Sequence, residues 1–438
     1  MSSLLVDITM ARKPKPQHIQ LPTHMSRKHS PGTAELTSAT VNMKGLPNFD
    51  KLSPHHFEKV RLLGRGDVGK VYLVHLRGAP KDSQYYAMKV LEKQDMINRK
   101  KVQRCLTERE ILSSSRHPFI VTMYASFQDE DKLYMLMEYC AGGELFRVLQ
   151  TQPNKCLCES SVRFFIAEVL LALEYLHKVG VVYRDLKPEN VLLHESGHIR
   201  LTDFDLSKRT SITNLDDHST TRSRPWLFPL FAKKAITRAH HCQSFVGTAE
   251  YISPEIINGT GYGPCVDWWT LGILLYEMIY AKTPYRGENN DETFNKVLHG
   301  KLNIPVNSCH GPVSKNCRNL IKKLLHVDMN KRLGHKHGAK DIKDHAFFKG
   351  VNWDALQTQV AQAPIVKGEI DYTDFTNFQQ DLVDSDDEND DRDVIPEIGV
   401  EGVMPEMDQR SKLFKNFVYT PKTPTPTRTK GSPSQAIA

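Results

Sequence analysis

The pattern of apolar and polar positions divides the chain into a strand-rich part and a helix-rich part. Alternating apolar residues between polar or glycine-bearing turns predict strands at 57–64, 70–76, 85–91, 119–127 and 132–139. Apolar residues at helical spacing predict helices over 98–114, 161–178 and 265–281. We therefore expect an α+β fold with two lobes. A small antiparallel sheet lobe with one main helix would occupy 57–139, and a larger, mostly helical lobe would occupy 140–348.

The two ends of the chain lack this periodicity. Residues 1–53 are rich in Ser, Thr, Pro, Lys and His, which is typical of a disordered leader. A tail follows the large lobe over 349–419 and contains an acidic run at 381–393, where eight Asp and Glu stand against one Arg. The residues from 420 to 438 are rich in Pro and Thr and are expected to be disordered.

Composition excludes some classes of protein. The chain has 438 residues, of which 39% are hydrophobic and 25% charged, and its formal net charge is +7. Because this charge is mild and the sequence has no groove-reading module, we expect no nucleic-acid partner. The most apolar stretch, 268–281, is too short to span a bilayer and contains Glu277.

The eight cysteines indicate a reducing compartment. They form no paired C-x-x-C framework, and the close pair Cys156 and Cys158 has no His or Cys counterpart at metal-ligand spacing in the sequence. The first residues also lack the apolar core of a signal peptide. We therefore expect reduced thiols in a cytoplasmic protein.

A glycine-rich turn between the first two predicted strands is the first candidate site. It consists of Gly64, Arg65, Gly66, Asp67, Val68 and Gly69. Such a segment is often a plain tight turn, and a dinucleotide site would require a helix directly after the last glycine. A strand follows instead. We therefore interpret the turn as a lid whose backbone approaches the phosphates of ATP.

A Lys–Glu pair is expected to orient those phosphates. Lys89 lies on the third predicted strand, and Glu108 lies in the helix beyond it. A carboxylate at that place can direct the amine toward the α- and β-phosphates. Because a strand Lys by itself is usually just exposed, the interpretation depends on the pair.

Two neighbouring segments carry the groups that phosphoryl transfer needs. Residues 183–190 read Tyr-Arg-Asp-Leu-Lys-Pro-Glu-Asn, and residues 203–205 read Asp-Phe-Asp. Asp185 can accept the proton of a substrate hydroxyl, and Lys187 supplies a cation near the γ-phosphate. Asn190 and Asp203 offer the oxygen ligands that Mg²⁺ prefers. Together these groups predict phosphoryl transfer with ATP and Mg²⁺ rather than a set of structural polar residues.

Over 57–348 the chain resembles the protein kinase superfamily. Besides the motifs above, it has Ser-Pro-Glu at 253–255, a D-x-W-x-x-G pattern at 267–272, and a late Arg332. The resemblance implies that Arg332 pairs with Glu255 and that Arg184 meets a phosphate on the activation segment. It also implies a hinge and an apolar surround for adenine, made by Met137, Glu138, Cys140, Val71, Ala87 and Leu192.

Within that superfamily the chain is similar to the AGC group. This resemblance rests on the residues at 183–190, on the segment 244–248 and on an aromatic tail. It implies that Phe414 and Phe417, in a hydrophobic motif at 414–419, dock in a small-lobe groove beside the helix of Glu108. A sticky disordered patch is the alternative. Val418 stands where many members have a phosphorylatable Ser or Thr, which excludes control by phosphorylation there.

Asp205 replaces the Gly of the usual Asp-Phe-Gly motif. This spelling and an activation segment of 53 residues, from Asp203 to Glu255, resemble the branch of plant phototropins and fungal flippase kinases. Loss of that Gly also motivates an alternative function, a scaffolding pseudokinase that binds ATP and partners without turnover. The intact Asp203 favours an active serine/threonine kinase acting on protein substrates in intracellular signalling.

The resemblance also implies regulation and substrate preference. Phosphorylation of Ser244, by an upstream kinase of the phosphoinositide-dependent type, would give Arg184 a dianionic partner. Glu144, Glu189 and Glu277 would select substrates with Arg upstream of the target hydroxyl, with salt bridges inside the lobe as the alternative.

An insert at about 209–242 lies within the activation segment. It contains six Lys and Arg, interleaved with Trp226, Phe228 and Phe231. A mobile loop is one interpretation of this insert. Peripheral contact with the plasma membrane is the other, because basic charge beside aromatic rings suits an anionic membrane surface.

Overall fold

The computed structural model of the chain describes residues 52–66, 69–80, 84–209, 249–260, 263–361, 363 and 413–421. Several sequence-based predictions fall outside these ranges. They are the loop positions Asp67 and Val68, the switch residue Ser244, and most of the leader, the insert and the acidic tail. The prediction of domain boundaries therefore stays a prediction.

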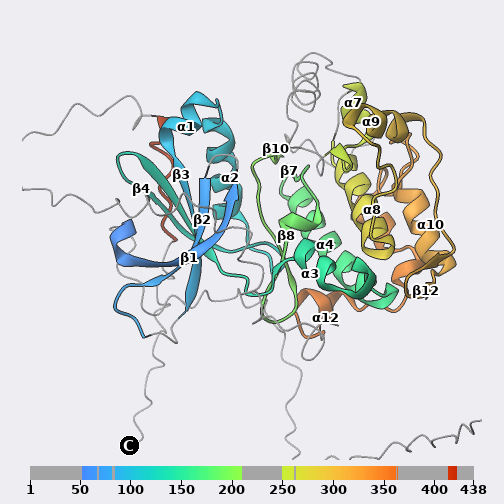
Figure 1. Ribbon diagram of the computed structural model, residues 1–438, viewed down its shortest axis with the longest axis horizontal. Coiled ribbons are helices and arrows are strands. Elements are labelled where there is room, and N and C mark those ends of the chain that lie inside the picture. Colours follow the sequence, from blue (N-terminus) through green and yellow to red (C-terminus); the bar gives the residue numbers. More distant parts are fainter. Residues whose placement is uncertain are drawn as a thin grey trace, which may run out of the picture. The chain divides into compact units, whose positions relative to one another are not determined.

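A five-stranded antiparallel sheet forms the small lobe (Figure 1). Its strands lie in the order β1, β2, β3, β5, β4, with bounds Phe57–Gly66, Gly69–Leu76, Tyr85–Glu92, Lys132–Glu138 and Met123–Gln128. Strand β5 is buried at every position from Leu133 to Met137, and β3 is buried from Tyr86 to Met88 and at Leu91, so both strands are covered on both faces. A short 3₁₀ turn, Pro54–His56, precedes β1.

Two helices accompany this sheet, where one was expected over 98–114. Helix α1 covers Lys93–Asn98, and α2 covers Val102–Ser114 and contacts β4. The predicted helix began too early, because Lys100 has a φ of 54° and a left-handed residue breaks the helical hydrogen-bond ladder. The strand predicted over 119–127 also began too early. β4 starts at Met123, while Phe119 and Val121 pair with Leu201 of the large lobe.

The large lobe is mostly helical, as the sequence predicts. Its core helices are α4 (Glu159–Lys178) and α8 (Cys265–Tyr280), which pack against each other, and α10 (Lys315–Leu324) packs against α8. Helix α8 is buried nearly all round, which explains its lack of a polar face. The other helices are α3 Leu145–Thr151, η3 Pro153–Lys155, η4 Pro188–Asn190, α7 Pro254–Asn258, α9 Asn290–His299, α11 Ala339–Lys343, η5 Ala346–Phe348 and α12 Trp353–Gln357.

Short strands at the start of the large lobe face the small lobe's sheet. β6 (Gly143–Glu144), β8 (Val191–Leu193) and β9 (Ile199–Leu201) form one sheet, and β7 (Val181–Val182) pairs with β10 (Lys208–Arg209). A separate hairpin joins β11 (Asn307–Ser308) to β12 (Gly311–Pro312). The expected α+β architecture is confirmed. Among the described helices, none combines the length and the apolar character needed to cross a membrane.

The C-terminal segment 413–421 packs on the small lobe, where Figure 1 draws it in red. Phe414 and Phe417 are fully buried. Tyr419 forms an isolated antiparallel bridge with Ser126 of β4, with backbone N···O distances of 2.9 and 3.1 Å. A segment far along the sequence therefore extends the small lobe's packing.

One prediction about the cysteines is wrong. The structure joins Cys156 and Cys309, which are 153 residues apart in the sequence, by a disulfide. The cysteines at 105, 140, 158, 265 and 317 are free. The pairing was missed because nothing in the local spacing of either cysteine indicates that the fold brings them together.

Candidate active site

A cavity of about 670 Å³ lies between the sheet of the small lobe and the short strands of the large lobe. Most of the predicted nucleotide-site residues line it: Gly64, Arg65, Gly66, Gly69, Val71, Ala87, Lys89, Glu108, Met137, Glu138, Cys140, Lys187, Asn190, Leu192 and Asp203. Leu63, Val121 and Thr202 also line the cavity, and their sequence context did not predict this position. Their signal is weak, because an apolar or hydroxyl residue beside a strand is ordinary without the tertiary context.

The described glycines of the turn between β1 and β2 have different roles. A Cβ on Gly69 would stand 2.4 Å from the carbonyl oxygen of Val90, so the packing of β2 against β3 requires a glycine there. A Cβ on Gly64 would meet no atom within 4 Å. Gly64 therefore leaves free the space beside the cavity that a phosphate would need.

Lys89 and Glu108 join β3 to α2 at the edge of the cavity. The Lys89 Nζ donates to both carboxylate oxygens of Glu108, at 2.7 and 2.9 Å, and lies 3.9 Å from Oδ1 of Asp203. Burial by itself lowers the pKa of the Lys89 ammonium. The charges of Glu108 and Asp203 outweigh it and hold that pKa above its usual value, so Lys89 stays cationic.

Asp185 is the centre of a buried hydrogen-bond network. Asn190 Nδ2 donates to the Asp185 carbonyl at 2.8 Å and to Asp185 Oδ2 at 2.7 Å, and Lys187 Nζ donates to Oδ2 at 3.1 Å. Burial raises the pKa of the Asp185 carboxyl to about 6, although the nearby Lys187 lowers it. The carboxylate is thus held in one orientation and is basic enough to accept a proton near neutral pH.

A buried carboxylate holds the loop that carries Asp185. Asp267 of α8 is fully buried and accepts from the backbone nitrogens of Tyr183 and Arg184, at 2.9 and 2.7 Å. His177 Nε2 lies 2.7 Å from the same carboxylate. Arg184 has a φ of 67°, and its Nε donates to the Leu206 carbonyl at 2.6 Å. Asp267, the first residue of the D-x-W-x-x-G pattern, therefore fixes the backbone of the loop that carries Asp185.

Asp203 and Asn190 present oxygen atoms that suit a hard cation. The Asn190 amide nitrogen is already used on Asp185, which leaves its side-chain oxygen as the free group. The Asp203 side chain is 42% exposed and lines the cavity, and its φ of 55° is left-handed. Carboxylate and amide oxygens are the usual protein ligands of Mg²⁺, so these residues fit that ion.

Asp205 occupies its place without needing glycine. It does not belong to the described residues with positive φ, so the backbone there suits any side chain. Its carboxylate Oδ2 lies 3.4 Å from Nη1 of Arg104 on α2. The ion pair between Arg104 and Asp205 was not predicted, because nothing in the local sequence pattern distinguishes Arg104 from an exposed helical Arg.

Some of the residues predicted for the hinge and for substrate recognition line the cavity, and one does not. Glu138 lines the cavity, but its carboxylate accepts from Arg200 Nε at 3.1 and 3.2 Å, so it is engaged away from a ligand. Glu144 and Glu189 line the cavity, whereas Glu277 does not. Glu277 accepts a short hydrogen bond from the Tyr251 hydroxyl.

Glu189 influences the ionisation of Glu144 and Glu277, the other two acids that the sequence predicts for substrate recognition. Burial raises the pKa of the Glu144 carboxyl, and the charge of Glu189 adds to that effect although Arg147 opposes it. Burial also raises the pKa of Glu277 to about 7, and Glu189 contributes there too. Glu144 Oε2 lies 3.8 Å from Arg147 Nε, a half-exposed pair that a competing cation can replace. Glu144 and Glu189 therefore place two carboxyl groups in the cavity lining, and Glu277 lies outside that lining.

The Ser-Pro-Glu segment is tied to the late Arg as the resemblance implies. Arg332 Nη1 and Nη2 donate to the two carboxylate oxygens of Glu255 at 2.6 and 2.8 Å, and both residues are buried. Arg332 also donates to the carbonyls of His326 and Cys265. This bidentate pair fixes the end of the activation segment against α8.

Helix α2 also holds the C-terminal segment. Arg109 Nε donates to the Phe417 carbonyl at 2.8 Å, and its Nη2 donates to the Val418 carbonyl at 2.7 Å. Gln128 of β4 donates to the Phe414 carbonyl at 3.1 Å. Because Arg109 follows Glu108 directly, the docked segment and the Lys89–Glu108 pair share one helix turn.

Comparison with known proteins agrees with this geometry. A family model described as protein kinase domain matches residues 57–348. Flippase kinase 1 of Saccharomyces cerevisiae is 52% identical over 308 residues, which cover 70% of this chain and 33% of that protein. Serine/threonine-protein kinase nrc-2 of Neurospora crassa is 48% identical over 340 residues, covering 75% of this chain and 53% of that protein.

Two further relatives complete the comparison. Serine/threonine-protein kinase ppk22 of Schizosaccharomyces pombe is 49% identical over 321 residues, covering 72% of this chain and 60% of that protein. Phototropin-1A of rice, Oryza sativa subsp. japonica, is 45% identical over 333 residues, covering 75% of this chain and 35% of that protein. The chain thus spans between 33% and 60% of the length of these curated relatives.

Proposed function

The chain belongs to the protein kinase family, and we propose that it transfers the γ-phosphoryl group of ATP to serine and threonine hydroxyls of protein substrates. The observation that carries this proposal is the convergence of Lys89, Asp203, Lys187 and Asn190 on one cavity, with Asp185 hydrogen-bonded to the last two. Relatives named as serine/threonine-protein kinases, at 48% and 49% identity, support the choice of hydroxyl.

In the proposed reaction, the chain's own residues position the reactants and hold charge. Lys89, kept cationic and fixed by Glu108, binds the α- and β-phosphates. Asp185 accepts a hydrogen bond from the substrate hydroxyl and then its proton as the oxygen attacks the γ-phosphorus, while the bond between the γ-phosphorus and the β–γ bridging oxygen breaks and ADP leaves with that electron pair. Lys187, 3.1 Å from Asp185 Oδ2, balances the charge that develops on the transferred group.

Mg²⁺ would be held by oxygens of Asp203 and Asn190, where it would neutralise phosphate charge. This role agrees with the exposure of the Asp203 side chain toward the cavity and with the free side-chain oxygen of Asn190. Asn190 has a second function in the structure, because its amide nitrogen orients Asp185.

A scaffolding pseudokinase is the disfavoured alternative. It was motivated by Asp205, but that residue needs no glycine backbone and pairs with Arg104. The Lys89–Glu108 ion pair is also formed, and the acceptor Asp185 is in place. A pseudokinase has no reason to keep all of these groups in contact around a cavity.

The direct test is label transfer from γ-phosphate-labelled ATP to an Arg-rich peptide library. Wild type is compared with Asp185→Ala, and Asp328→Ala, an exposed residue in the large lobe, is the matched control. We expect Asp185→Ala to lose about 10²- to 10⁴-fold in rate, while Asp328→Ala keeps the wild-type rate. Equal rates for wild type and Asp185→Ala would refute kinase activity.

For substrate choice, we propose selection of Arg upstream of the target hydroxyl by Glu144, Glu189 and Glu277. The proposal is supported by the clustering of these carboxyl groups, because Glu144 and Glu189 line the cavity and, in addition to the larger effect of burial, Glu189 raises the pKa of both Glu144 and Glu277. In the same peptide library, loss of Arg preference in Glu189→Gln would support the proposal. A library that shows no Arg preference in wild type would refute it.

For regulation, we propose that an upstream kinase of the phosphoinositide-dependent type phosphorylates Ser244. The phosphate would pair with Arg184, whose backbone is already held by Asp267. Full activity of Ser244→Ala in cells would refute this switch.

For localisation, we propose a cytoplasmic protein that contacts the plasma membrane peripherally through the basic and aromatic insert. Its support is the sequence of residues 209–242. Deletion of the insert should abolish binding to anionic vesicles and leave the peptide rate measurable. Unchanged vesicle binding after deletion would refute membrane contact.

A further inference from the structure

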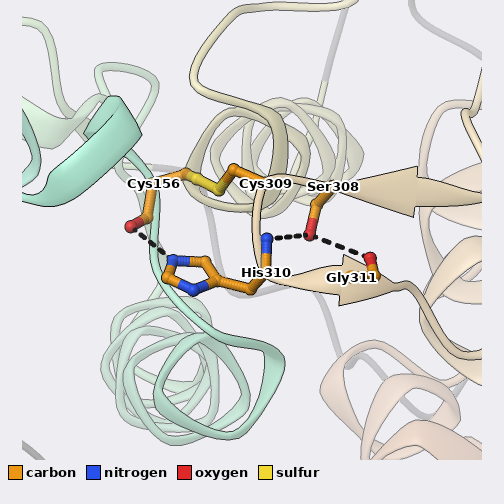
Figure 2. The surroundings of a disulfide bond; sticks show 5 residues. All are labelled: Cys156, Ser308, Cys309, His310 and Gly311. Atoms are coloured by element: carbon orange, nitrogen blue, oxygen red, sulfur yellow. Dashed lines mark hydrogen bonds between the residues drawn. A yellow bond between two sulfur atoms is a disulfide. The ribbon is translucent and has the colours of Figure 1, made fainter. Parts of the chain in front are cut away.

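Cys156, Cys309 and His310 meet beside the turn between β11 and β12 of the large lobe (Figure 2). None of the three residues lines the active-site cavity. Cys156 lies between η3 and α4, and the other two residues form the turn between β11 and β12. The two Sγ atoms and one imidazole nitrogen lie within 4.8 Å of one another. Three side chains with soft or borderline ligand atoms therefore share one place.

The cluster is sealed on one side and open on the other. Cys156 is 1% exposed, whereas Cys309 and His310 are exposed. A cation from solvent can therefore reach the outer two ligands, while the inner thiol is shielded from water. The cluster therefore combines one buried ligand residue with two ligand residues that solvent can reach.

Local hydrogen bonds already hold the ligands in place. His310 Nε2 lies 3.1 Å from the Cys156 carbonyl oxygen, and the His310 backbone nitrogen donates to Ser308 Oγ at 3.3 Å (Figure 2). Just beyond the hairpin, the Ser314 nitrogen and hydroxyl donate to Glu159 of α4 at 2.8 and 2.6 Å. The hairpin and the start of α4 are thus fixed to each other by contacts that are independent of the cysteines.

The backbone spacing suits two sulfur atoms with a cation between them. The Cα atoms of Cys156 and Cys309 are 7.3 Å apart. Most direct disulfides have Cα atoms about 4.4–6.8 Å apart, and a cation between the sulfurs lengthens the bridge. In a tetrahedral zinc site, bond lengths of about 2.0–2.3 Å place neighbouring ligand atoms about 3.5–3.8 Å apart.

We propose that Cys156, Cys309 and His310, with the cysteines reduced, form a site for a soft divalent cation of the zinc class. Two thiolates and an imidazole are the ligands that such a cation prefers, and this set contains no carboxylate to favour Mg²⁺ or Ca²⁺. Within the described ranges, these three side chains bring their ligand atoms within 4.8 Å of one another. The fourth coordination position stays open to water.

The site and the disulfide are two states of the same sulfurs. An external dithiol reduces the disulfide, supplies two electrons and two protons, and is itself oxidised to a disulfide. Cation binding then breaks the two S–H bonds, forms two metal–sulfur bonds and releases two protons to solvent. In both states the hairpin is tied to the start of α4, so the cation and the disulfide compete for the same pair.

The experiment uses the full chain, reduced with excess dithiol and desalted without air, with a thiol count to establish the reduced state. Co²⁺ is titrated as the spectroscopic probe, because thiolate ligands give a charge-transfer band and tetrahedral sites give strong visible bands. We expect one equivalent to bind with both bands, and Zn²⁺ to displace it. A fully reduced chain without a thiolate-to-metal band would overturn the proposal.

Three variants separate the site from other thiols. Cys309→Ser and His310→Ala should each weaken Co²⁺ binding at least tenfold. Cys158→Ser, which removes a free exposed thiol two residues from Cys156, should leave it unchanged. His310→Ala keeps both cysteines, so it tests the site even where Cys309→Ser lowers folded yield. Binding by His310→Ala as tight as wild type, or loss of binding in Cys158→Ser, would overturn the assigned ligand set.

Competition with oxidation gives a second readout that does not depend on kinase activity. Excess Zn²⁺ should slow peroxide oxidation of the reduced Cys156–Cys309 pair at least tenfold, measured by alkylation and peptide mapping. The buried thiol Cys317 serves as the internal control for reagent access. An oxidation rate that Zn²⁺ does not change would indicate a purely redox pair and would contradict the cation site.

Discussion

Arg104 of α2 forms an ion pair with Asp205, with 3.4 Å between Nη1 and Oδ2. Glycine at position 205 could not make this contact. Helix α2 also carries Glu108, which forms an ion pair with Lys89. Two ion pairs therefore join α2 to groups around the cavity. Both side chains are partly exposed, at 36% and 28%, which limits the contribution of the pair.

We predict that this pair contributes to catalysis by positioning α2. Arg104→Ala, Asp205→Asn and the double variant form a cycle, and its coupling energy should be about 0.2–1 kcal/mol, or about 1.4- to 5-fold in kcat/KM. Gln103→Ala, on an exposed part of the same helix, is the control. Fully additive single losses would show that the two side chains act independently.

Glu108→Gln should lower kcat/KM by about 100-fold. The substitution keeps the shape of the side chain but removes the charge that holds the Lys89 amine in place, and small displacements of positioning groups have effects of this size. Glu110→Gln makes the same chemical change on the exposed face of α2 and should stay within a few-fold of wild type. Steady-state peptide kinetics measure both, and similar losses in the two variants would contradict the prediction.

Arg332→Ala should destabilise the large lobe by about 3–5 kcal/mol, because it leaves the buried carboxylate of Glu255 without its partner. Urea unfolding followed by tryptophan fluorescence measures the change. Lys331→Ala, at a side chain 71% exposed, should change the free energy of unfolding by less than about 0.5 kcal/mol. If the two variants unfold at the same urea concentration, the buried pair is not a major support of this lobe.

Phe417→Ala should detach the C-terminal segment and lower activity. Phe417 is fully buried, and truncation of a buried Phe costs about 3–5 kcal/mol, which is large for a short segment held by a few hydrogen bonds. A peptide with the sequence of residues 413–421 should restore part of the rate when added in excess. Val418→Ala, at a side chain that is 51% exposed, is the control. If Phe417→Ala keeps the wild-type rate, docking of this segment does not contribute to activity.

Recognition of an upstream Arg should strengthen as pH rises through about 7. The raised pKa of Glu277, due to burial and to the charges of Glu189 and Glu250 and opposed by Tyr251 and Arg286, means that the carboxyl is mostly neutral at pH 6 and mostly ionised at pH 8. The ratio of KM values for an Ala-substituted and an Arg-bearing peptide should therefore rise about tenfold between these pH values at most.

Glu277→Gln is the control for that profile, because it keeps the acceptor for Tyr251 and removes the titration. We expect the KM ratio of this variant to stay flat from pH 6 to 8. A Glu277→Gln profile that rises as steeply as wild type would assign the pH dependence to another group.

Local patterns in the sequence predicted the fold class, and together with the family resemblance they predicted most of the cavity lining. Strand alternation and helical periodicity are local properties, so they indicated the sheet lobe and the helices at 161–178 and 265–281 with small errors at the ends. The candidate reactive groups Asp185, Lys187 and Asn190 could also be named from the sequence, because they stand close together in the chain, and the structure joins them by hydrogen bonds. The helix predicted over 98–114 began too early, because the left-handed residue Lys100 separates α1 from α2.

Contacts between side chains that are distant in the sequence became visible in the folded chain. Arg104 and Asp205 are 101 residues apart, Arg109 reaches Phe417 across 308 residues, and Cys309 joins Cys156 across 153. These contacts depend on how helices and hairpins pack, and packing is set by the summed burial of many apolar side chains rather than by any local spacing. A motif therefore identifies the groups that carry the chemistry, while the packed core decides which other charges and thiols come to lie beside them.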